Sequence, residues 1–203
     1  MPDDFALTNL TNHFLIAMPA LQDDVFHRSV VYLCEHSDRG ALGLIINKPC
    51  EISMTGLFEK LSLPLLRKDL LDVPVFLGGP VQNDRGFVLH DATFSQNNQP
   101  DESVYASTMV IAGGMEMTTS KDVLEAISAG FGPARVLVSL GYAAWGEGQL
   151  ESELSENSWL TVAADPALLF ETPFEERYDK ALKLLGLEDW MRSIDQVDAM
   201  SRI

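Results

Sequence analysis

The sequence has few of the residues that build disulfide frameworks, metal centres and membrane spans. Two cysteines in 203 residues are too few for a disulfide framework and fit a reducing compartment. The four histidines show no His-x-His or His-Glu-x-x-His spacing, so we predict no bound metal. No apolar run approaches the roughly 20 residues of a membrane-spanning helix, and the N-terminus lacks the basic start and apolar core of a signal peptide. We therefore expect a cytoplasmic protein without a membrane partner.

Basic residues are also scarce. The chain has 14 Lys and Arg against 30 Asp and Glu, which gives a net charge of −16. Nucleic-acid binding needs clustered basic side chains that displace phosphate counterions, so direct binding to DNA or RNA is disfavoured. The acidic surface aids solubility, and a docking face for a basic partner is the alternative that stays open.

Complete catalytic motifs are missing as well. Residues 141–148 follow a predicted strand, as a phosphate-binding loop does, but Glu147 and Gly148 stand where that loop needs Lys and then Ser or Thr. We interpret this stretch as a tight strand-to-helix turn, with Trp145 packed or lining a cleft. Residues 137–141 resemble a nucleophile elbow without its first glycine. The sequence therefore predicts no catalytic residue and no cofactor, and favours a binding protein over an enzyme.

What the chain does have is a repeated local layout. Residues 29–49 and 74–90 each contain apolar strands around a polar turn that carries Asp-Arg-Gly, at 37–40 and 83–86. Such turns between apolar runs predict hairpins. Few polar side chains lie along these strands, so those at the strand ends stand out.

These polar side chains form the candidate site. A rigid sheet can present strand-end residues to a ligand, and an arginine can clamp a carboxylate or phosphate. If the two hairpins pack together, we expect a surface that holds a small anion or a peptide segment of an unknown protein partner. The predicted ligand-binding residues are His36, Asn47, Lys48, Arg85, His90 and Trp145. The alternative is that the arginines are turn residues and the histidines bind backbone groups.

The order of elements indicates the fold class. Strands come early and helices late, and short turns favour antiparallel pairing, so we predict an α+β fold. Helices are expected at 53–63, at 121–129 after a Ser120 cap, and at 148–154. Later helices are expected to begin at Asp165-Pro166 and Thr172-Pro173. We expect a single domain over residues 1–203, with a loose N-terminus at 1–11 and a helical C-terminal tail at 187–203.

Longer blocks between Asn12 and Leu185 carry a family resemblance. The blocks are Phe14–Pro19, Ser29–Pro49, Gly78–Val81, Arg85–His90, Thr119–Leu124, Ser139–Tyr142, Trp145–Gly146, Gly148–Glu151 and Asn157–Leu160. With them the chain resembles the YqgE/AlgH family of bacterial proteins. The resemblance implies a bent, mostly antiparallel sheet curled into a partial barrel with flanking helices, in the bacterial cytoplasm. It implies no established reaction, although some members are labelled transcriptional regulators.

Three function hypotheses remain at this stage. The first is a cytoplasmic regulatory or binding protein that acts through a protein partner. The second is a small-molecule enzyme with His36 or His90 as general acid or base, because an unperturbed imidazole titrates near neutral pH. The third is a transcriptional regulator that binds DNA directly, which the net charge disfavours.

Overall fold

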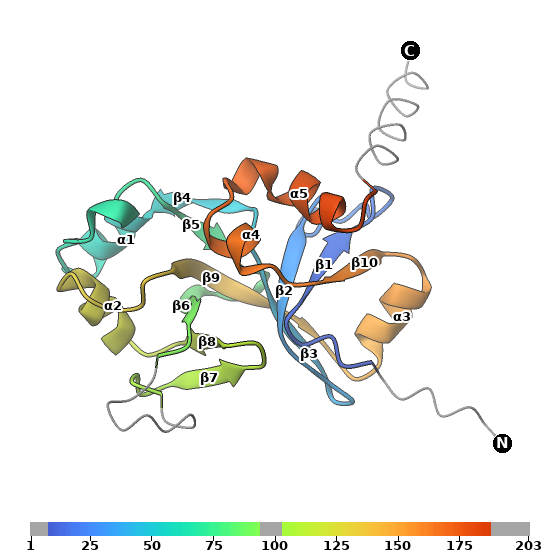
Figure 1. Cartoon of the computed structure of the whole chain (residues 1–203), viewed down its shortest axis with the longest axis horizontal. Coiled ribbons are helices and arrows are strands. Elements are labelled where there is room, and N and C mark those ends of the chain that lie inside the picture. Colours follow the sequence, from blue (N-terminus) through green and yellow to red (C-terminus); the bar gives the residue numbers. More distant parts are fainter. Residues whose placement is uncertain (1–7, 94–102, 188–203) are drawn as a thin grey trace, which may run out of the picture. The chain divides into compact units, whose positions relative to one another are not determined.

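The structure, a computed structural model, describes residues 8–93 and 103–187. The described chain divides into two compact units. Unit 1 combines the described residues up to Asn47 with those from Ala144 onward, and unit 2 comprises Lys48–Ala143. Each unit has strands and helices of its own (Figure 1). The single domain expected from the chain length stays a prediction.

The sheet of unit 1 is antiparallel, with the strand order β10-β1-β2-β3. Strands β1 and β2 are almost fully buried, which indicates that both faces of the sheet are covered. The turn between Ser37 and Gly40 joins β2 to β3, so the hairpin predicted at this turn is confirmed. The bounds are β1 His13–Ala17, β2 Val30–Ser37, β3 Gly40–Ile45 and β10 Trp159–Ala163.

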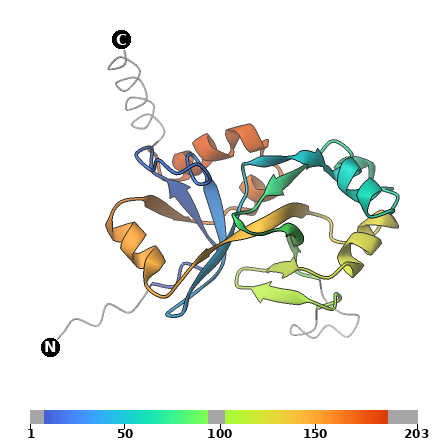
Figure 2. The same ribbon diagram turned by 180° about the vertical axis from the view of Figure 1, so that it is seen from behind.

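Helices pack along this sheet. Helix α5 (Arg177–Leu184) lies beside β1 and β2, and the hydroxyl of Tyr178 donates a hydrogen bond to the carbonyl of Ala17 at 2.6 Å (Figure 1). Helix α3 (Gln149–Ser155) lies beside β3 and β10, as seen from behind in Figure 2. Between them are α4 (Pro166–Phe170) and the 3-10 turn η2 (Phe174–Glu176).

The helix starts of unit 1 test two predicted caps. Asp165 caps α4 as predicted, because its carboxylate accepts the N–H of Ala167 at 3.1 Å. The predicted cap at Thr172 is wrong. Its hydroxyl donates backward to the carbonyl of Ala167, and η2 begins after Pro173 without a side-chain cap.

The sheet of unit 2 has the strand order β4-β5-β9-β6-β8-β7. Its pairs are antiparallel except for β5 with β9, which run parallel with Phe76 opposite Ser139. The core is apolar, with Val75, Val88 and Val138 among its buried residues. The bounds are β4 Pro49–Ser53, β5 Pro74–Leu77, β6 Val81–Asp91, β7 Thr108–Ile111, β8 Met115–Thr118 and β9 Val136–Trp145.

The helices of unit 2 confirm the helix predicted from residue 53 and correct the predicted Ser120 cap. Helix α1 (Met54–Lys60) is capped by Ser53, whose hydroxyl accepts the N–H of Gly56 at 3.1 Å. Helix α2 (Asp122–Ser128) has no side-chain cap, so the predicted Ser120 cap is wrong. The Ser120 oxygen instead accepts the N–H of Ser107 at 3.1 Å, and its hydroxyl donates to the carboxylate of Asp122. A 3-10 turn, η1, covers Lys68–Leu70.

The stretch at 141–148 also differs from the prediction. We expected a tight turn there, but β9 continues as a strand to Trp145, and only Gly146–Gly148 connect it to α3. The pairing of β9 with β6 extends as far as Tyr142, which lies opposite Val81 beyond the irregular part of β6. Overall, the α+β class, the mostly antiparallel pairing and the flanking helices are confirmed. The helical tail expected at 187–203 lies outside the described residues, apart from Leu187.

Candidate functional site

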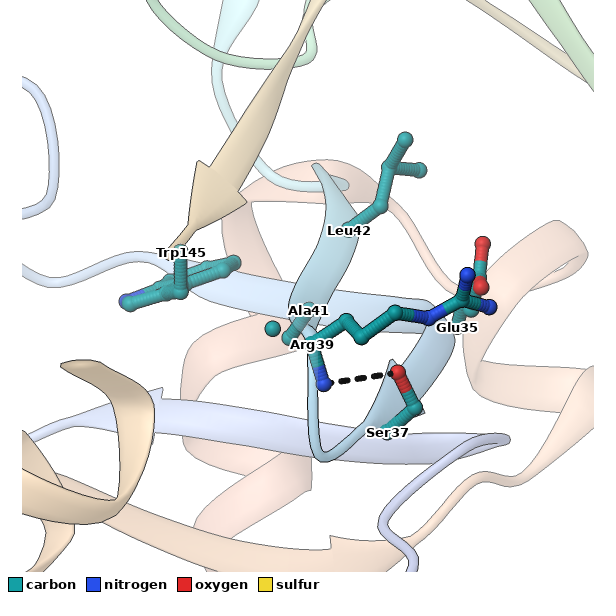
Figure 3. A pocket seen from close by; sticks show the side chains of 7 residues that line it. Glu35, Ser37, Arg39, Ala41, Leu42 and Trp145 are labelled. Atoms are coloured by element: carbon teal, nitrogen blue, oxygen red, sulfur yellow. Dashed lines mark hydrogen bonds between the residues drawn. The ribbon is translucent and has the colours of Figure 1, made fainter. Parts of the chain in front are cut away.

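An open groove of about 400 Å³ lies along the β2–β3 hairpin of unit 1 (Figure 3). We call it the hairpin groove. Most of its lining comes from the hairpin, and the end of β9 contributes one side chain. The lining residues are Glu35, Ser37, Arg39, Gly40, Ala41, Leu42 and Trp145.

A β-bulge decides which hairpin side chains reach this groove. The register shifts between Leu33 and Glu35, so that Cys34 is an extra residue on β2. A bulge interrupts the alternation of faces. Glu35 is therefore opposite Leu42, and both side chains line the groove, whereas the neighbouring His36 is buried.

The tryptophan wall of the groove is held rigidly. The indole N–H of Trp145 donates to Glu153 Oε2 at 2.9 Å, and the indole N–H of Trp159 donates to the same oxygen at 2.8 Å. Gln149 donates to the other carboxylate oxygen at 3.1 Å. The ring of Phe26 packs against both indoles, with centroids 6.0 and 5.6 Å away. The groove is thus bounded by a fixed aromatic face.

Close backbone packing adds to this rigidity. Gly40 has φ +129°, and a Cβ atom at this residue would collide with the carbonyl oxygen of Trp145. The hairpin turn can therefore approach the end of β9 only with glycine at this position. This contact keeps the turn against the tryptophan wall.

The groove carries one charge of each sign. Glu35 and Arg39 are exposed, and within the described ranges neither side chain makes a hydrogen bond or ion pair. Only the backbone N–H of Arg39 is engaged, by Ser37 Oγ at 3.2 Å. In Figure 3 the Arg39 side chain extends toward Glu35 and away from Trp145. The groove therefore offers an acceptor and a donor beside an apolar wall.

Of the residues predicted from the sequence, His36 is buried in unit 1. Its Nδ1 accepts the N–H of Leu10 at 3.0 Å, so the neutral ring carries its proton on Nε2. This Nε2 donates to Glu151 Oε1 at 2.6 Å. Both ring nitrogens are therefore occupied. The same contact holds part of the segment 1–11, because Leu10 is buried with it.

Asn47 lies at the opposite end of β2. Its Oδ1 accepts the N–H of Val30 and its Nδ2 donates to the carbonyl of Arg28, both at 2.9 Å. Val30 and His36 are six positions apart, which is about 20 Å along a strand. The structure therefore does not bring Asn47 and His36 together. Trp145 alone of the predicted residues lines the hairpin groove.

The three remaining predicted residues belong to unit 2 and have contrasting surroundings. His90 is 0% exposed, and burial lowers its pKa. Its Nδ1 donates to the carbonyl of Asp91 at 2.7 Å, and its Nε2 accepts the hydroxyl of Thr118 at 2.8 Å. Arg85 is exposed and Lys48 is half-buried. Ligand binding by the six predicted residues stays a prediction.

Sequence reasoning missed most of the groove. It treated Arg39 as a turn residue and did not single out Glu35 or Leu42. The Asp-Arg-Gly turn was a usable signal for Arg39, but the bulge that turns Glu35 outward leaves no mark in the residue pattern. Among the described residues, no group of three or more His, Cys, Asp or Glu could hold a metal ion. The same residues include no helix that is long and apolar enough to span a membrane.

Comparison with known proteins gives a consistent family match. The AlgH-like family matches residues 14–190. A UPF0301 protein of Albidiferax ferrireducens is 74% identical over 195 residues, covering 96% of this chain and 98% of the relative. A UPF0301 protein of Variovorax paradoxus is 68% identical over 193 residues, with 95% and 97% covered. None of these names states an activity.

Two solved structures are similar in fold. The solution structure of the AlgH protein from Pseudomonas aeruginosa has a TM-score of 0.73 at 47% identity, covering 89% of this chain and 91% of that one. A crystal structure of a Corynebacterium diphtheriae protein has a TM-score of 0.64 at 17% identity, with 86% of each chain covered. The second likeness shows the fold alone.

Proposed function

We propose that this chain, which belongs to the AlgH-like family, is a non-enzymatic binding protein whose hairpin groove holds a peptide segment of a partner protein. One observation carries the proposal. Glu35 and Arg39 line one open groove beside the wall of Trp145, and within the described residues neither side chain has a partner. Unpaired charges around an apolar wall suit a ligand with both apolar and polar groups.

The groove favours a peptide over a small anion. It is open to solvent and lined mostly by the hairpin, so it is accessible to a segment of another chain. A free anion beside Arg39 would also face the carboxylate of Glu35. A peptide can place one acidic group on Arg39, one basic group on Glu35 and an apolar side chain against Trp145. Opposite charges on the wall would then set the direction of the bound segment.

The overall charge indicates the kind of partner. A net charge of −16 attracts a basic protein and accelerates its encounter with this chain. A regulatory role would therefore act through a protein partner rather than through DNA. We place this role in the cytoplasm, which the free thiols of Cys34 and Cys50 support.

The geometry of the histidines argues against the enzyme alternative. A general acid or base must reach a ligand with a titrating nitrogen. In His36 one nitrogen is used by Leu10 and the other by Glu151, and in His90 both nitrogens are used inside unit 2. Neither ring has a free nitrogen for proton transfer to a ligand.

A displayed library of random short peptides tests the proposal. The immobilised native chain should enrich peptides that combine an apolar residue with basic and acidic residues. Binding of an enriched peptide, measured by fluorescence anisotropy, should weaken about fivefold in Arg39→Ala and in Glu35→Ala, because each loses an ion pair of about 1 kcal/mol.

Asp38→Ala is the matched control, because Asp38 is exposed in the same turn but does not line the groove. It should change the Kd less than twofold. A library without enrichment, or an Asp38→Ala variant as weak as Arg39→Ala, would show that the groove is not the binding site.

A further inference from the structure

Unit 2 contains a second cavity, of about 280 Å³, which we call the α1–α2 cavity. Its walls are apolar. The apolar lining consists of Leu57, Leu61, Val88, Leu124, Val138 and Leu140. Two of these, Val88 and Val138, are buried core residues, and Leu57, Leu124 and Leu140 pack against that core. The walls are therefore fixed by the same packing that holds the unit together.

Three of the polar side chains that line this cavity lack a partner among the described residues, and two of them, Asp84 and Lys121, are exposed. Asp84, Thr119 and Lys121 line it, and within the described residues none of their side chains makes a hydrogen bond or an ion pair. Asp84 and Lys121 carry opposite charges, yet they do not pair with each other. The neighbouring Ser120 differs, because its hydroxyl donates to Asp122. The cavity thus presents a carboxylate, a hydroxyl and an ammonium beside an apolar interior.

Gly86 provides an independent sign of open space. Asp84, Gly86 and Val88 of β6 all line the cavity, with Asp84 in the irregular part of the strand. A Cβ atom at Gly86 would meet no other heavy atom within 4 Å. The wall therefore has room for atoms that the chain itself does not supply.

We propose that the α1–α2 cavity binds a free apolar α-amino acid of about the size of leucine. Its ammonium would pair with Asp84, its carboxylate with Lys121 and the Thr119 hydroxyl, and its side chain would contact the leucine and valine walls. The cavity volume corresponds to about nine water molecules, and leucine has about as many non-hydrogen atoms. A ligand with one charge would leave the opposite charge of the cavity facing it.

The ligand itself supplies the first test. Leucine, leucinamide and 4-methylpentanoate have nearly the same shape, but leucinamide lacks the carboxylate and 4-methylpentanoate lacks the ammonium. Isothermal titration into the millimolar range should give leucine a Kd at least tenfold lower than that of either analogue. The proposal is overturned if leucine, methionine and phenylalanine all fail to bind, or if the analogues bind as tightly as leucine.

Substitutions of Lys121 and Asp84 then test which side chain binds the carboxylate of the ligand and which binds its ammonium. Lys121→Gln should raise the Kd of leucine at least tenfold but leave that of leucinamide unchanged. Asp84→Asn should weaken leucine and leave 4-methylpentanoate unchanged. Arg85→Gln is the control, since Arg85 is adjacent to Asp84 but does not line the cavity. An effect of Arg85→Gln as large as that of Lys121→Gln would refute the assignment.

A filling substitution completes the design. Gly86→Val should place a side chain in the space beside Val88 without a clash, and valine suits a strand. This variant should keep the thermal unfolding midpoint of the native chain and lose leucine binding. Native leucine affinity in a folded Gly86→Val variant would show that the ligand binds elsewhere. The analogue series on the native chain decides the proposal if any variant fails to fold.

Discussion

Substitution of Asn47 tests whether this strand-end residue holds the backbone. Its amide bridges two main-chain groups at the start of β2, the N–H of Val30 and the carbonyl of Arg28. Val30 is fully buried, so water cannot easily replace the lost acceptor, whereas the bond to Arg28 is exposed. We expect Asn47→Ala to destabilise unit 1.

The magnitude follows from these two bonds. A buried N–H without an acceptor costs about 1–3 kcal/mol, and an exposed hydrogen bond contributes at most about 0.5 kcal/mol. The sum is about 2 kcal/mol, a large share of the roughly 5–15 kcal/mol that stabilises a typical domain. Asn47→Asp keeps the acceptor for Val30 and loses only the donor, so it should cost less than about 1 kcal/mol.

Urea unfolding followed by tryptophan fluorescence measures this cost. Trp145 and Trp159 belong to unit 1, as Asn47 does, so their signal reports on the affected unit. With a slope of about 2 kcal/mol per molar urea, Asn47→Ala should lower the midpoint by about 1 M. Gln22→Ala is the control. It removes an exposed amide that makes no side-chain hydrogen bond among the described residues, and should stay within about 0.5 kcal/mol of the native chain.

Two results would refute this reasoning. One is an Asn47→Ala midpoint equal to that of Gln22→Ala, which would mean that the two bonds contribute nothing. The other is an Asn47→Asp variant as unstable as Asn47→Ala, which would mean that the acceptor for Val30 is not the main contribution.

Two further predictions concern His90 and Gly40. Burial lowers the pKa of His90 below its ordinary 6.5, so the unfolded chain binds the proton more readily than the folded chain. The free energy of unfolding should therefore fall as the pH drops below about 6.5. The fall should be at most about 1.4 kcal/mol per pH unit. Urea unfolding at pH 7.5, 6.5 and 5.5 should show a shallower fall in His90→Gln, and an equal fall in both proteins would contradict the assignment. Gly40→Ala should cost about 3 kcal/mol, because it combines backbone strain with a collision at the Trp145 carbonyl. Gly148→Ala, with φ +70° and open space around its Cβ, should cost only about 1 kcal/mol, and equal losses would exclude the collision.

Much of the fold could be predicted from the residues because local rules decide it. Ser37–Gly40 predicts a hairpin turn by composition, Ser53 predicts the start of α1, and Asp165 with Pro166 predicts the start of α4. The family could also be predicted from the residues, because long matching sequence blocks identify a family without knowledge of the structure. Strands β8 and β10 were not predicted, because a short segment becomes a strand only when a distant partner supplies its hydrogen bonds.

The candidate site depends far more on long-range contacts. His36 and Asn47 looked equivalent as polar ends of apolar strands, but His36 meets Glu151 from 115 residues away and Asn47 bonds the backbone of Val30. In unit 2, Asp84 and Lys121 meet at one cavity from separate segments, although the sequence offered Lys121 only as a neighbour of a capping serine.

The sequence by itself determined the class of fold, the hairpin turn at Ser37–Gly40, several helix starts and the strong negative charge, because each depends on nearby residues or on composition alone. The second predicted hairpin is wrong, because residues 83–86 lie inside β6, which pairs with β8 and β9 instead of with β5. Only the tertiary structure decided which polar groups are satisfied and which remain open to a ligand. The bulge at Cys34 shows the physical reason. One extra residue, set by pairing with β3, turns Glu35 toward the groove while its neighbour His36 is buried, and no periodicity along β2 records that choice.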